Sequence, residues 1–386
     1  MSIIARISSH PFHVSEKTNW FFICVESNRG DKAWGEASLN GWEPMLEAAT
    51  QLRALELIGL ELEVALSHLK PSAQSPGGLA ANAVTSALHQ ALASLQASEL
   101  GVPLYQLLGQ AQRLHVPVYA NINRATIDRQ PEGFAATALR AANSGFRAFK
   151  AAPFDGVTPA NCSTSQGQAL IRHGIECMLA IRDAVGPEAL VMGDCHWRFD
   201  EARALSVLEA LRPAMLHWFE CPVAETHAHW PALRKIRAAA HSQGVLLAAA
   251  ETQVGLPSFE TLFQERLYDV VMPDVKYCGG PREMLRIAER ASEQGVVFSP
   301  HNPTGPICTL SSLHVAVVAR QCQLLELQFD ESPLYDALVS NGHPLLIDGG
   351  FSIPQTVALG VQLDEEILNA SPYQKVPFGI ETLMAG

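Results

Sequence analysis

The sequence predicts an α/β protein whose larger part is a (β/α) barrel of the TIM type, modified and built from seven to eight units. In its second half, six short apolar runs each end in a residue that can bind a metal or move a proton. These end residues are 23 to 31 residues apart, the length of one strand, one crossover helix and two loops. The 386 residues also suit a barrel of roughly 250 residues plus a smaller domain.

Three segments are expected along the chain. Residues 1–114 are predicted to form an N-terminal α+β capping domain, because a strand-like stretch at 20–26 precedes two segments of helical periodicity. Residues 115–343 carry the strand and helix alternation of the barrel. Residues 344–386 hold no further repeat unit, and we expect this tail to pack back on the capping domain.

Composition excludes several classes of partner. Hydrophobic residues make up 48% and charged residues 17%, as in globular proteins. The formal net charge of −12 disfavours nucleic acid or an anionic membrane surface as a partner. No segment has the roughly 20 apolar residues of a membrane span, no secretory signal is seen, and the eight cysteines are scattered without a C-x-x-C pair. A cytoplasmic protein with reduced thiols is expected.

The residues that end the six apolar runs are the candidates for metal binding and proton transfer. In a parallel barrel, the residues at the carboxyl ends of the strands meet at one mouth. Side chains far apart in the sequence are therefore expected to share one site. The six end residues are Asp194 (with His196 just beyond it), Glu220, Glu251, Asp274, His301 and Glu326.

Three of these ends are carboxylates from consecutive strands. Asp194, Glu220 and Glu251 offer hard oxygen ligands without a cysteine or histidine, a set that suits Mg²⁺ better than Zn²⁺. For any single one, capping of the next helix is an equally good interpretation. Three together without a cation would be costly, so a single Mg²⁺ per subunit is predicted.

Two histidines are candidates for proton transfer. Asp274 and His301 end neighbouring strands, and a carboxylate on one ring nitrogen makes the other nitrogen a better base. His196 lies two residues after Asp194 and would face the same side of its strand. The alternatives are that His301 is a structural turn residue before Asn-Pro, and that His196 is half-buried and bonded to backbone.

Two further residues are expected at the mouth. Lys150 ends the strand FRAFK one unit before Asp194 and could hold a developing oxyanion. Glu326 could accept a hydrogen bond from a substrate hydroxyl. A surface lysine and an ordinary loop acid are the alternatives. The long loop at 151–168 is predicted to be either a lid or a disordered segment.

Several motifs together resemble the enolase superfamily and, within it, the mandelate racemase-like subgroup of acid sugar dehydratases of the galactonate dehydratase type. The matching stretches are GFRAFK, GDCHWRF, WFECP, AAAET, MPDVKYCGG, SPHNPTGPI and LLELQ. The segments WFFICVES, GDKAWGEAS and GVPLYQLLG are similar to that family's capping domain, so the resemblance covers nearly the full chain.

The resemblance implies a role for each residue of the site. Asp194, Glu220 and Glu251 would bind Mg²⁺. His301 with Asp274 would remove the proton next to a substrate carboxylate, and His196 would protonate the departing hydroxyl. Lys150 matches the first lysine of the family's K-x-K and would contact the substrate carboxylate.

Two positions depart from the family pattern. Ala152 stands where racemases and some aldarate dehydratases have a basic lysine, which favours a dehydratase that relies on its two histidines. The stretch before Glu251 reads AAA where relatives often carry a Gly, and the segment from Glu220 to Glu251 is about five residues longer than in galactonate dehydratase-like chains.

The expected function is Mg²⁺-dependent loss of the C2 proton and C3 hydroxyl of an acid sugar through an ene-diolate, which gives a 2-keto-3-deoxy acid. The alternatives are an epimerase or racemase of a carboxylate substrate, and a non-catalytic acid-sugar-binding protein on the same scaffold. The resemblance also implies a homo-oligomer. The substrate is expected to be selected by loops near 17–20, 39–44 and 154–166.

Overall fold

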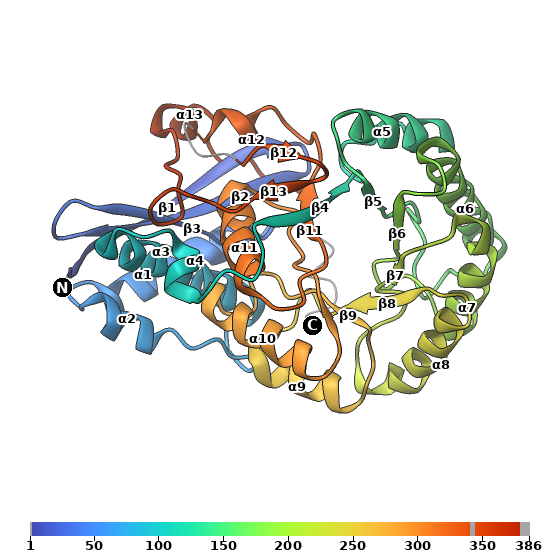
Figure 1. The fold of residues 1–386 in the computed structure, drawn as a ribbon, viewed down its shortest axis with the longest axis horizontal. Coiled ribbons are helices and arrows are strands. Elements are labelled where there is room, and N and C mark those ends of the chain that lie inside the picture. Colours follow the sequence, from blue (N-terminus) through green and yellow to red (C-terminus); the bar gives the residue numbers. More distant parts are fainter. Residues whose placement is uncertain (1, 340–343, 379–386) are drawn as a thin grey trace.

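The computed structural model describes residues 2–339 and 344–378 and confirms the predicted α/β barrel with an N-terminal cap (Figure 1). Eight parallel strands, each ending at the same mouth, build the barrel in the described residues. They are β4 (His115–Asn121), β5 (Ala148–Ala151), β6 (Leu190–Asp194), β7 (Trp218–Glu220), β8 (Leu246–Ala249), β9 (Val270–Val271), β10 (Val297–Phe298) and β11 (Leu325–Gln328).

A helix follows each of the first seven barrel strands and covers its outer side (Figure 1). The seventh and last of these helices leads into β11, so the chain has seven full units and an eighth strand. The helices are α5 (Pro131–Asn143), α6 (Ser165–Val185), α7 (Glu201–Ala210), α8 (Trp230–His241), α9 (Gly255–Gln264), α10 (Pro281–Glu293) and α11 (Pro306–Val318), with 3-10 turns at Arg212–Ala214 and His227–His229.

The strands from β4 to β10 pair in chain order, and β11 returns to pair with β4. Backbone hydrogen bonds also connect β10 and the residue after next with β11 and the segment just before it. They run from Gln323 N to Phe298 O at 3.0 Å and from Glu326 N to Pro300 O at 3.4 Å. The ring of strands is thereby closed. Consecutive parallel strands place their carboxyl ends at one edge, which is the arrangement that the strand spacing predicts.

The cap is an antiparallel sheet with helices packed against it. Its strands pair in the order β1-β2-β3, and the long helix α3 lies against β2 and β3. The elements are β1 (Ile4–Ser15), β2 (Thr18–Ser27), β3 (Lys32–Glu36), α1 (Glu43–Leu57), α2 (Leu62–His68), α3 (Gly78–Leu100) and α4 (Leu104–Leu108).

The chain after the barrel contacts both parts of the molecule. Its hairpin of β12 (Leu346–Ile347) and β13 (Gly350–Ser352) pairs antiparallel with the start of β4. Beyond it, Ser371 exchanges hydrogen bonds with His13 of the cap. Two short helices complete the tail, α12 (Leu334–Ala337) and α13 (Glu365–Ala370). The predicted boundary after residue 343 falls at the undescribed segment 340–343 and stays a prediction.

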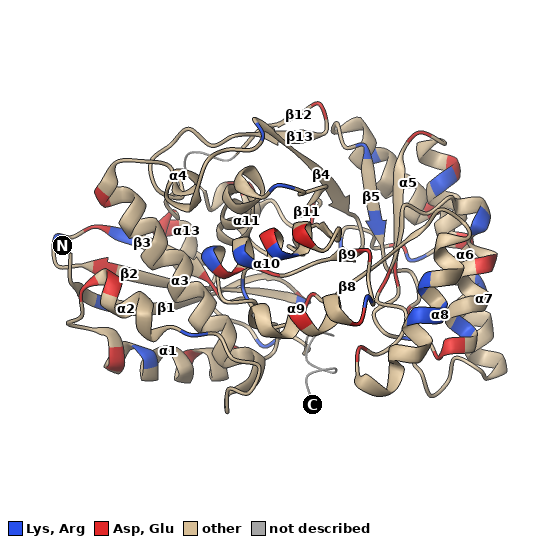
Figure 2. Ribbon diagram, turned by 60° about the horizontal axis from the view of Figure 1, so that its bottom comes forward, with Lys and Arg blue, Asp and Glu red and all other residues tan. Residues whose placement is uncertain are grey.

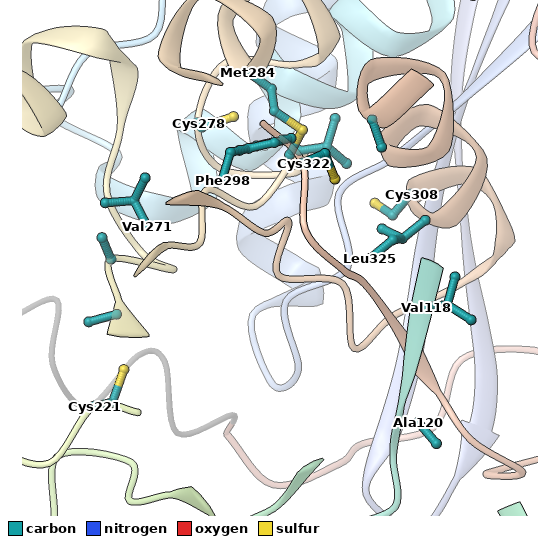
Figure 3. Packing of buried hydrophobic residues seen from close by; sticks show 14 of the residues in the cluster. Val118, Ala120, Cys221, Val271, Cys278, Met284, Phe298, Cys308, Cys322 and Leu325 are labelled. Atoms are coloured by element: carbon teal, nitrogen blue, oxygen red, sulfur yellow. The ribbon is translucent and has the colours of Figure 1, made fainter. Parts of the chain in front are cut away.

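Side chains alternate between the two faces of the barrel wall because successive strand residues point to opposite sides. The inward residues fill the barrel with a small cluster that includes Tyr119 of β4, Met192 of β6 and Trp218 of β7. The outward residues pack under the helices. Figure 3 shows Met284 of α10 and Phe298 of β10 in the layer where that helix covers the strand.

Cap and barrel meet at a pair of glycines that precede α10. Gly280 has a φ of +81°, and a Cβ there would lie 2.6 Å from the Cβ of His89 on α3. Only glycine therefore allows this backbone to approach the cap helix so closely.

The outer surface is polar. Figure 2 shows Lys, Arg, Asp and Glu along α6, α7 and α8. Across the described residues, no helix combines the length and the apolar character that a membrane span requires.

The loop predicted to be a lid or a disordered segment is packed on the barrel. Phe154 is buried against Phe199, and the backbone oxygen of Phe154 accepts a hydrogen bond from Arg198. Thr164 closes the loop by capping α6, since its hydroxyl accepts from Gly167 N at 3.1 Å. Disorder is therefore not what the structure shows for this loop.

Candidate active site at the barrel mouth

All eight predicted site residues lie at the carboxyl ends of the barrel strands. Asp194 and Glu220 are register partners on β6 and β7. Asp274 and His301, just beyond β9 and β10, form a parallel bridge. The mouth opens on a cavity of about 450 Å³, lined by site residues that include Lys150, Asp194, His196, Glu251 and His301.

Lys150 is a buried ammonium surrounded by carboxylates. Its side chain is 1% exposed, and Nζ lies 2.6 Å from Glu220 Oε1, 3.0 Å from Glu326 Oε1 and 3.9 Å from Asp194 Oδ2. Burial alone would lower the pKa of Lys150, but these carboxylates raise it well above its ordinary value. The lysine is charged and holds three strand ends together, so the alternative of a surface lysine is wrong.

The carboxylates at the mouth exceed what the lysines can neutralise. Glu220 is fully buried, and its Oε2 accepts a hydrogen bond from Trp218 Nε1 at 2.8 Å. Burial raises the pKa of Glu220, and repulsion from Asp194, Glu326 and Glu251 adds to the rise against the opposing charge of Lys150. Negative charge is therefore crowded at this point.

Asp194 and His196 form a pair on one side of the cavity. His196 Nε2 lies 2.9 Å from Asp194 Oδ2, and His196 N donates to Asp194 Oδ1 at 3.1 Å. Burial lowers the pKa of His196, but the Asp194 carboxylate outweighs it and the pKa is raised. For Asp194 the effects have the opposite signs. Burial raises the pKa of Asp194, but the neighbouring His196 and Lys150 bring it below the ordinary value. His196 thus favours the protonated form, which suits an acid.

Asp274 and His301 form a second pair. His301 Nδ1 donates to Asp274 Oδ2 at 2.7 Å, and the opposite ring nitrogen, Nε2, lies 3.7 Å from Glu251 Oε2. Asp274 is fully buried, and although burial raises its pKa, the neighbouring Lys276 and His301 bring it below the ordinary value. The carboxylate fixes a tautomer whose other nitrogen can accept a proton. The alternative of His301 as a mere turn residue is not what the geometry supports.

Glu326 lies between these groups rather than in a surface loop. Its Oε1 accepts from Asn121 Nδ2 at 2.8 Å, and its Oε2 accepts from Asn302 N at 2.9 Å. Burial raises the pKa of Glu326, but the neighbouring Lys150 and His301 have the larger effect together. The net result is a pKa below the ordinary value. Glu326 is an ionised, fully bonded carboxylate that holds Lys150 in place.

The predicted Mg²⁺ ligands are hard oxygen donors on three adjacent strand ends. Asp194, Glu220 and Glu251 are 3%, 0% and 2% exposed. Within residues 2–339 and 344–378, no three His, Cys, Asp or Glu side chains are gathered closely enough to hold a metal ion. The donor set nevertheless fits Mg²⁺, because buried carboxylates outnumber the lysines, and burial together with the neighbouring carboxylates raises the pKa of Glu220.

The backbone is strained beside each of these three carboxylates. Positive φ angles occur at His196 (+47°), Cys221 (+44°) and Ala250 (+81°). A left-handed conformation costs a residue with a side chain about 1–2 kcal/mol. Ala250 belongs to the AAA stretch before Glu251, and glycine is the residue best suited to its conformation. Such strain gathers at functional sites, where the surrounding structure holds it.

Part of the cavity wall was missed by the sequence analysis. Asn121, Asn123, Arg124 and Arg129, at and after the end of β4, line the cavity. Asn121 ends its strand just as the six predicted residues do, so the same rule applied to VPVYAN would have found it. The arginines carried no comparable signal, because their place on the loop depends on how it folds.

The predicted specificity loops each contribute to the cavity. Lys17 and Asn40 come from the two cap loops, and Asp155 comes from the loop after β5. Lys17 stands at the turn between β1 and β2, and its backbone N donates to Ser15 Oγ at 3.3 Å. Cap and barrel therefore both contribute to the wall of the site.

Comparison with known proteins identifies the family. Residues 133–367 match the family described as "Enolase C-terminal domain-like". The match covers more than half of the chain, so the chain belongs to this family and is an enzyme of the enolase superfamily, as its motifs predict.

Individual relatives are similar along nearly the whole chain. It is 28% identical over 373 residues to D-galactonate dehydratase of Variovorax paradoxus (strain S110), covering 94% of this chain and 93% of the relative. It is 26% identical over 360 residues to D-xylonate dehydratase of Haloferax volcanii, covering 91% and 85%.

Among solved structures, a protein assigned as an L-alanine-DL-glutamate epimerase from Burkholderia xenovorans strain LB400, bound to magnesium and fumarate, has a TM-score of 0.85. The sequences are 22% identical, and the match covers 99% of this chain and 98% of that chain. At this identity the likeness shows the fold.

Proposed function

We propose that the chain is a Mg²⁺-dependent dehydratase that converts an acid sugar into its 2-keto-3-deoxy acid. The observation that carries the proposal is the presence of two histidines at one cavity, each on its own carboxylate. His301 is paired through Nδ1 with Asp274, and His196 through Nε2 with Asp194. One base and one acid are what the loss of a proton and a hydroxyl from neighbouring carbons requires.

His301 is the proposed base. With Nδ1 donating to Asp274, Nε2 carries the lone pair and takes the proton from C2 of the substrate. The electrons of the C2–H bond form the double bond of an ene-diolate between C1 and C2.

His196 is the proposed acid. Its carboxylate partner Asp194 raises its pKa against burial and so favours the protonated ring, which can deliver a proton to the C3 hydroxyl as the C3–O bond breaks and water leaves. The resulting enol becomes the 2-keto-3-deoxy acid when C3 takes up a proton.

Lys150 and the carboxylates provide the electrostatic setting. The charged Lys150, held by Glu220 and Glu326, lines the cavity and is placed to contact the substrate carboxylate, where negative charge grows. Asp194, Glu220 and Glu251 would hold one Mg²⁺. When bound, the metal supplies Lewis-acid stabilisation of that same charge. The relative from Burkholderia xenovorans, solved with magnesium, supports this choice of metal.

The test is a screen of mono- and diacid sugars with Mg²⁺, in which 2-keto-3-deoxy product is detected as its semicarbazone. Wild type is expected to form product from at least one acid, and His301→Asn and a chelator are each expected to abolish it. His241→Asn is a matched control, because His241 is also paired with an aspartate, Asp269, but on the surface. If wild type forms no product from any acid, the dehydratase proposal fails.

Metal binding has a readout independent of turnover. Mg²⁺ added to chelator-treated protein is expected to raise the Tm, because a ligand that binds only the folded state stabilises it. Glu251→Gln is expected to weaken this response. An unchanged Tm in wild type over millimolar Mg²⁺ would contradict the proposed metal site.

An epimerase is the second candidate. His196 and His301 at one cavity could also remove and return a proton at C2, as the likeness to the epimerase structure allows. Solvent deuterium at C2 of recovered substrate, with no keto product, would favour it. A ligand that binds with Mg²⁺ and stays unchanged, without C2 exchange, would favour the non-catalytic alternative.

We also infer a homo-oligomer in the cytoplasm. All eight cysteines are free and buried, which supports a reducing compartment. Light scattering on the eluting peak of a sizing column would test the assembly, and a monomeric mass would contradict it.

A further inference from the structure

Lys276 is a buried cation that the proposed mechanism does not use. It follows Asp274 by two residues, its side chain is 1% exposed, and its Nζ is ion-paired with Asp274 Oδ2. Its backbone N donates to the other oxygen, Oδ1, at 2.9 Å. Nζ also lies 4.1 Å from the centre of the Tyr277 ring, in cation–π contact. Lys276 does not line the cavity at the mouth, so it is not placed to contact substrate.

The contact matters because Asp274 Oδ2 is shared. The same oxygen that binds Lys276 Nζ accepts from His301 Nδ1 at 2.7 Å. With Oδ1 held by the backbone N of Lys276 and Oδ2 held by its ammonium, the carboxylate has one orientation. That orientation presents Oδ2 to His301 and so fixes the ring of the proposed base.

A buried acid of the cap binds the segment that follows His301. Glu36 ends β3 and is fully buried, with Oε1 accepting from Gly305 N at 2.7 Å and Oε2 from Cys308 N at 3.0 Å. These two donors stand at the start of α11, shortly after His301. Burial raises the pKa of Glu36, and its hydrogen bonds with Cys308, Ser38 and Gly305 oppose that rise, with a smaller contribution from the charge of Lys276.

The barrel and the cap meet tightly at this point. A Cβ on Gly305 would lie 2.9 Å from both carboxylate oxygens of Glu36, so a side chain there would have to displace that carboxylate. The acid of the cap thus binds the segment that follows His301.

We infer that Lys276 is a positioning residue for the proposed base, which holds the Asp274 carboxylate on His301. The inference rests on the proposed function, since it assigns the residue a part in proton removal by His301. The competing explanation is that Lys276 is only the counter-charge that lets Glu36 stay buried.

Two substitutions separate these explanations. Lys276→Met keeps the length of the side chain and removes its charge, while Glu36→Gln keeps the size and hydrogen-bonding capacity of the cap residue and removes its charge. Their combination leaves neither charge in the interior. Each variant is assayed with Mg²⁺ on the best acid sugar, and its thermal unfolding is recorded.

A positioning role predicts that Lys276→Met lowers kcat by roughly 10- to 100-fold, the range for residues that orient an active group, with KM changed less than about threefold. Glu36→Gln should keep most of kcat. The double variant should recover the Tm lost in Lys276→Met but not the kcat. Recovery of kcat together with Tm in the double variant, or a wild-type kcat in Lys276→Met, would overturn the inference.

A crystal structure of Lys276→Met distinguishes failure of this inference from failure of the proposed function. The Asp274 carboxylate is expected to turn away from His301 Nδ1, whether or not any acid sugar is a substrate. An intact Asp274–His301 contact in that variant would overturn the positioning role even if wild type proves to be a dehydratase.

Discussion

At the scale of single residues, the site depends on side chains held in unusual states. Lys150 is a charged ammonium in a closed interior because Glu220 and Glu326 contact it at 2.6 and 3.0 Å. Removal of one partner from such a buried set leaves a charge uncompensated, which costs more than the loss of a surface pair. The backbone beside the three predicted metal ligands is likewise kept in a conformation that its residues do not prefer.

Ala250→Gly tests that backbone strain. Ala250 has a φ of +81°, a conformation that glycine adopts without steric cost. The substitution is expected to raise the free energy of unfolding by about 1 kcal/mol, after the larger chain entropy of glycine in the unfolded state is subtracted. Urea denaturation with the chelated protein measures it. A loss of stability of similar size would show that the Ala250 conformation is not strained.

At the scale of elements, the turn between β1 and β2 places a cation, Lys17, at the wall of the cavity. Lys17 lines the cavity and is exposed, and the part of the chain that the structure describes contains no ion pair of its ammonium. The other lining cations have carboxylate partners, as Arg124 has with Glu331 and Arg129 with Asp155. We therefore expect Lys17 to contact the substrate.

Lys17→Gln is expected to raise KM for the best acid sugar about tenfold with little change in kcat, since a hydrogen bond to a charged group contributes about 1.5–3 kcal/mol. Lys32→Gln is a matched control from the same sheet, because Lys32 is paired with Glu365 and does not line the cavity. Equal effects of both substitutions would contradict a role for Lys17 in binding.

Helix α11 connects the barrel to α4 and to the tail through one histidine. His314 Nδ1 accepts from Tyr105 N at 3.0 Å, and Nε2 lies 3.4 Å from Leu359 O, so the neutral ring bridges three segments. Burial lowers the pKa of His314 to about 4, against which the bond to Leu359 is a minor effect. In the folded protein His314 therefore takes up a proton only at a lower pH than in the unfolded chain, where its pKa is near 6.5.

This linkage predicts the sign of a pH dependence. The stability that neutral His314 contributes is present above pH 6.5 and is lost as pH falls toward 4, by on the order of 3 kcal/mol. Comparison of the unfolding free energy of wild type and His314→Gln between pH 7 and 4 measures this loss. The variant should show a shallower decline, and parallel curves would contradict the assignment.

At the scale of the whole molecule, the barrel and much of the candidate site follow from strand periodicity. Asp194, Glu251 and His301 share one cavity because parallel strands end at one edge, a rule that needs no coordinates. The contacts of Glu36 with Gly305 and Cys308 could not be foreseen, since they depend on how the cap approaches the start of α11. The positive φ of Ala250 also left no pattern in the sequence beyond the departure of the AAA stretch from relatives.

The central claim is that His301 removes the C2 proton and His196 completes the elimination, and an isotope experiment on His196→Asn tests it most directly. The variant and wild type are incubated in D₂O with Mg²⁺ and the acid sugar that wild type dehydrates. We expect His196→Asn to form almost no keto acid yet to incorporate deuterium at C2 of the recovered substrate, because the base is intact. Keto acid at the wild-type rate, or recovered substrate without deuterium, would contradict the division of roles between the two histidines.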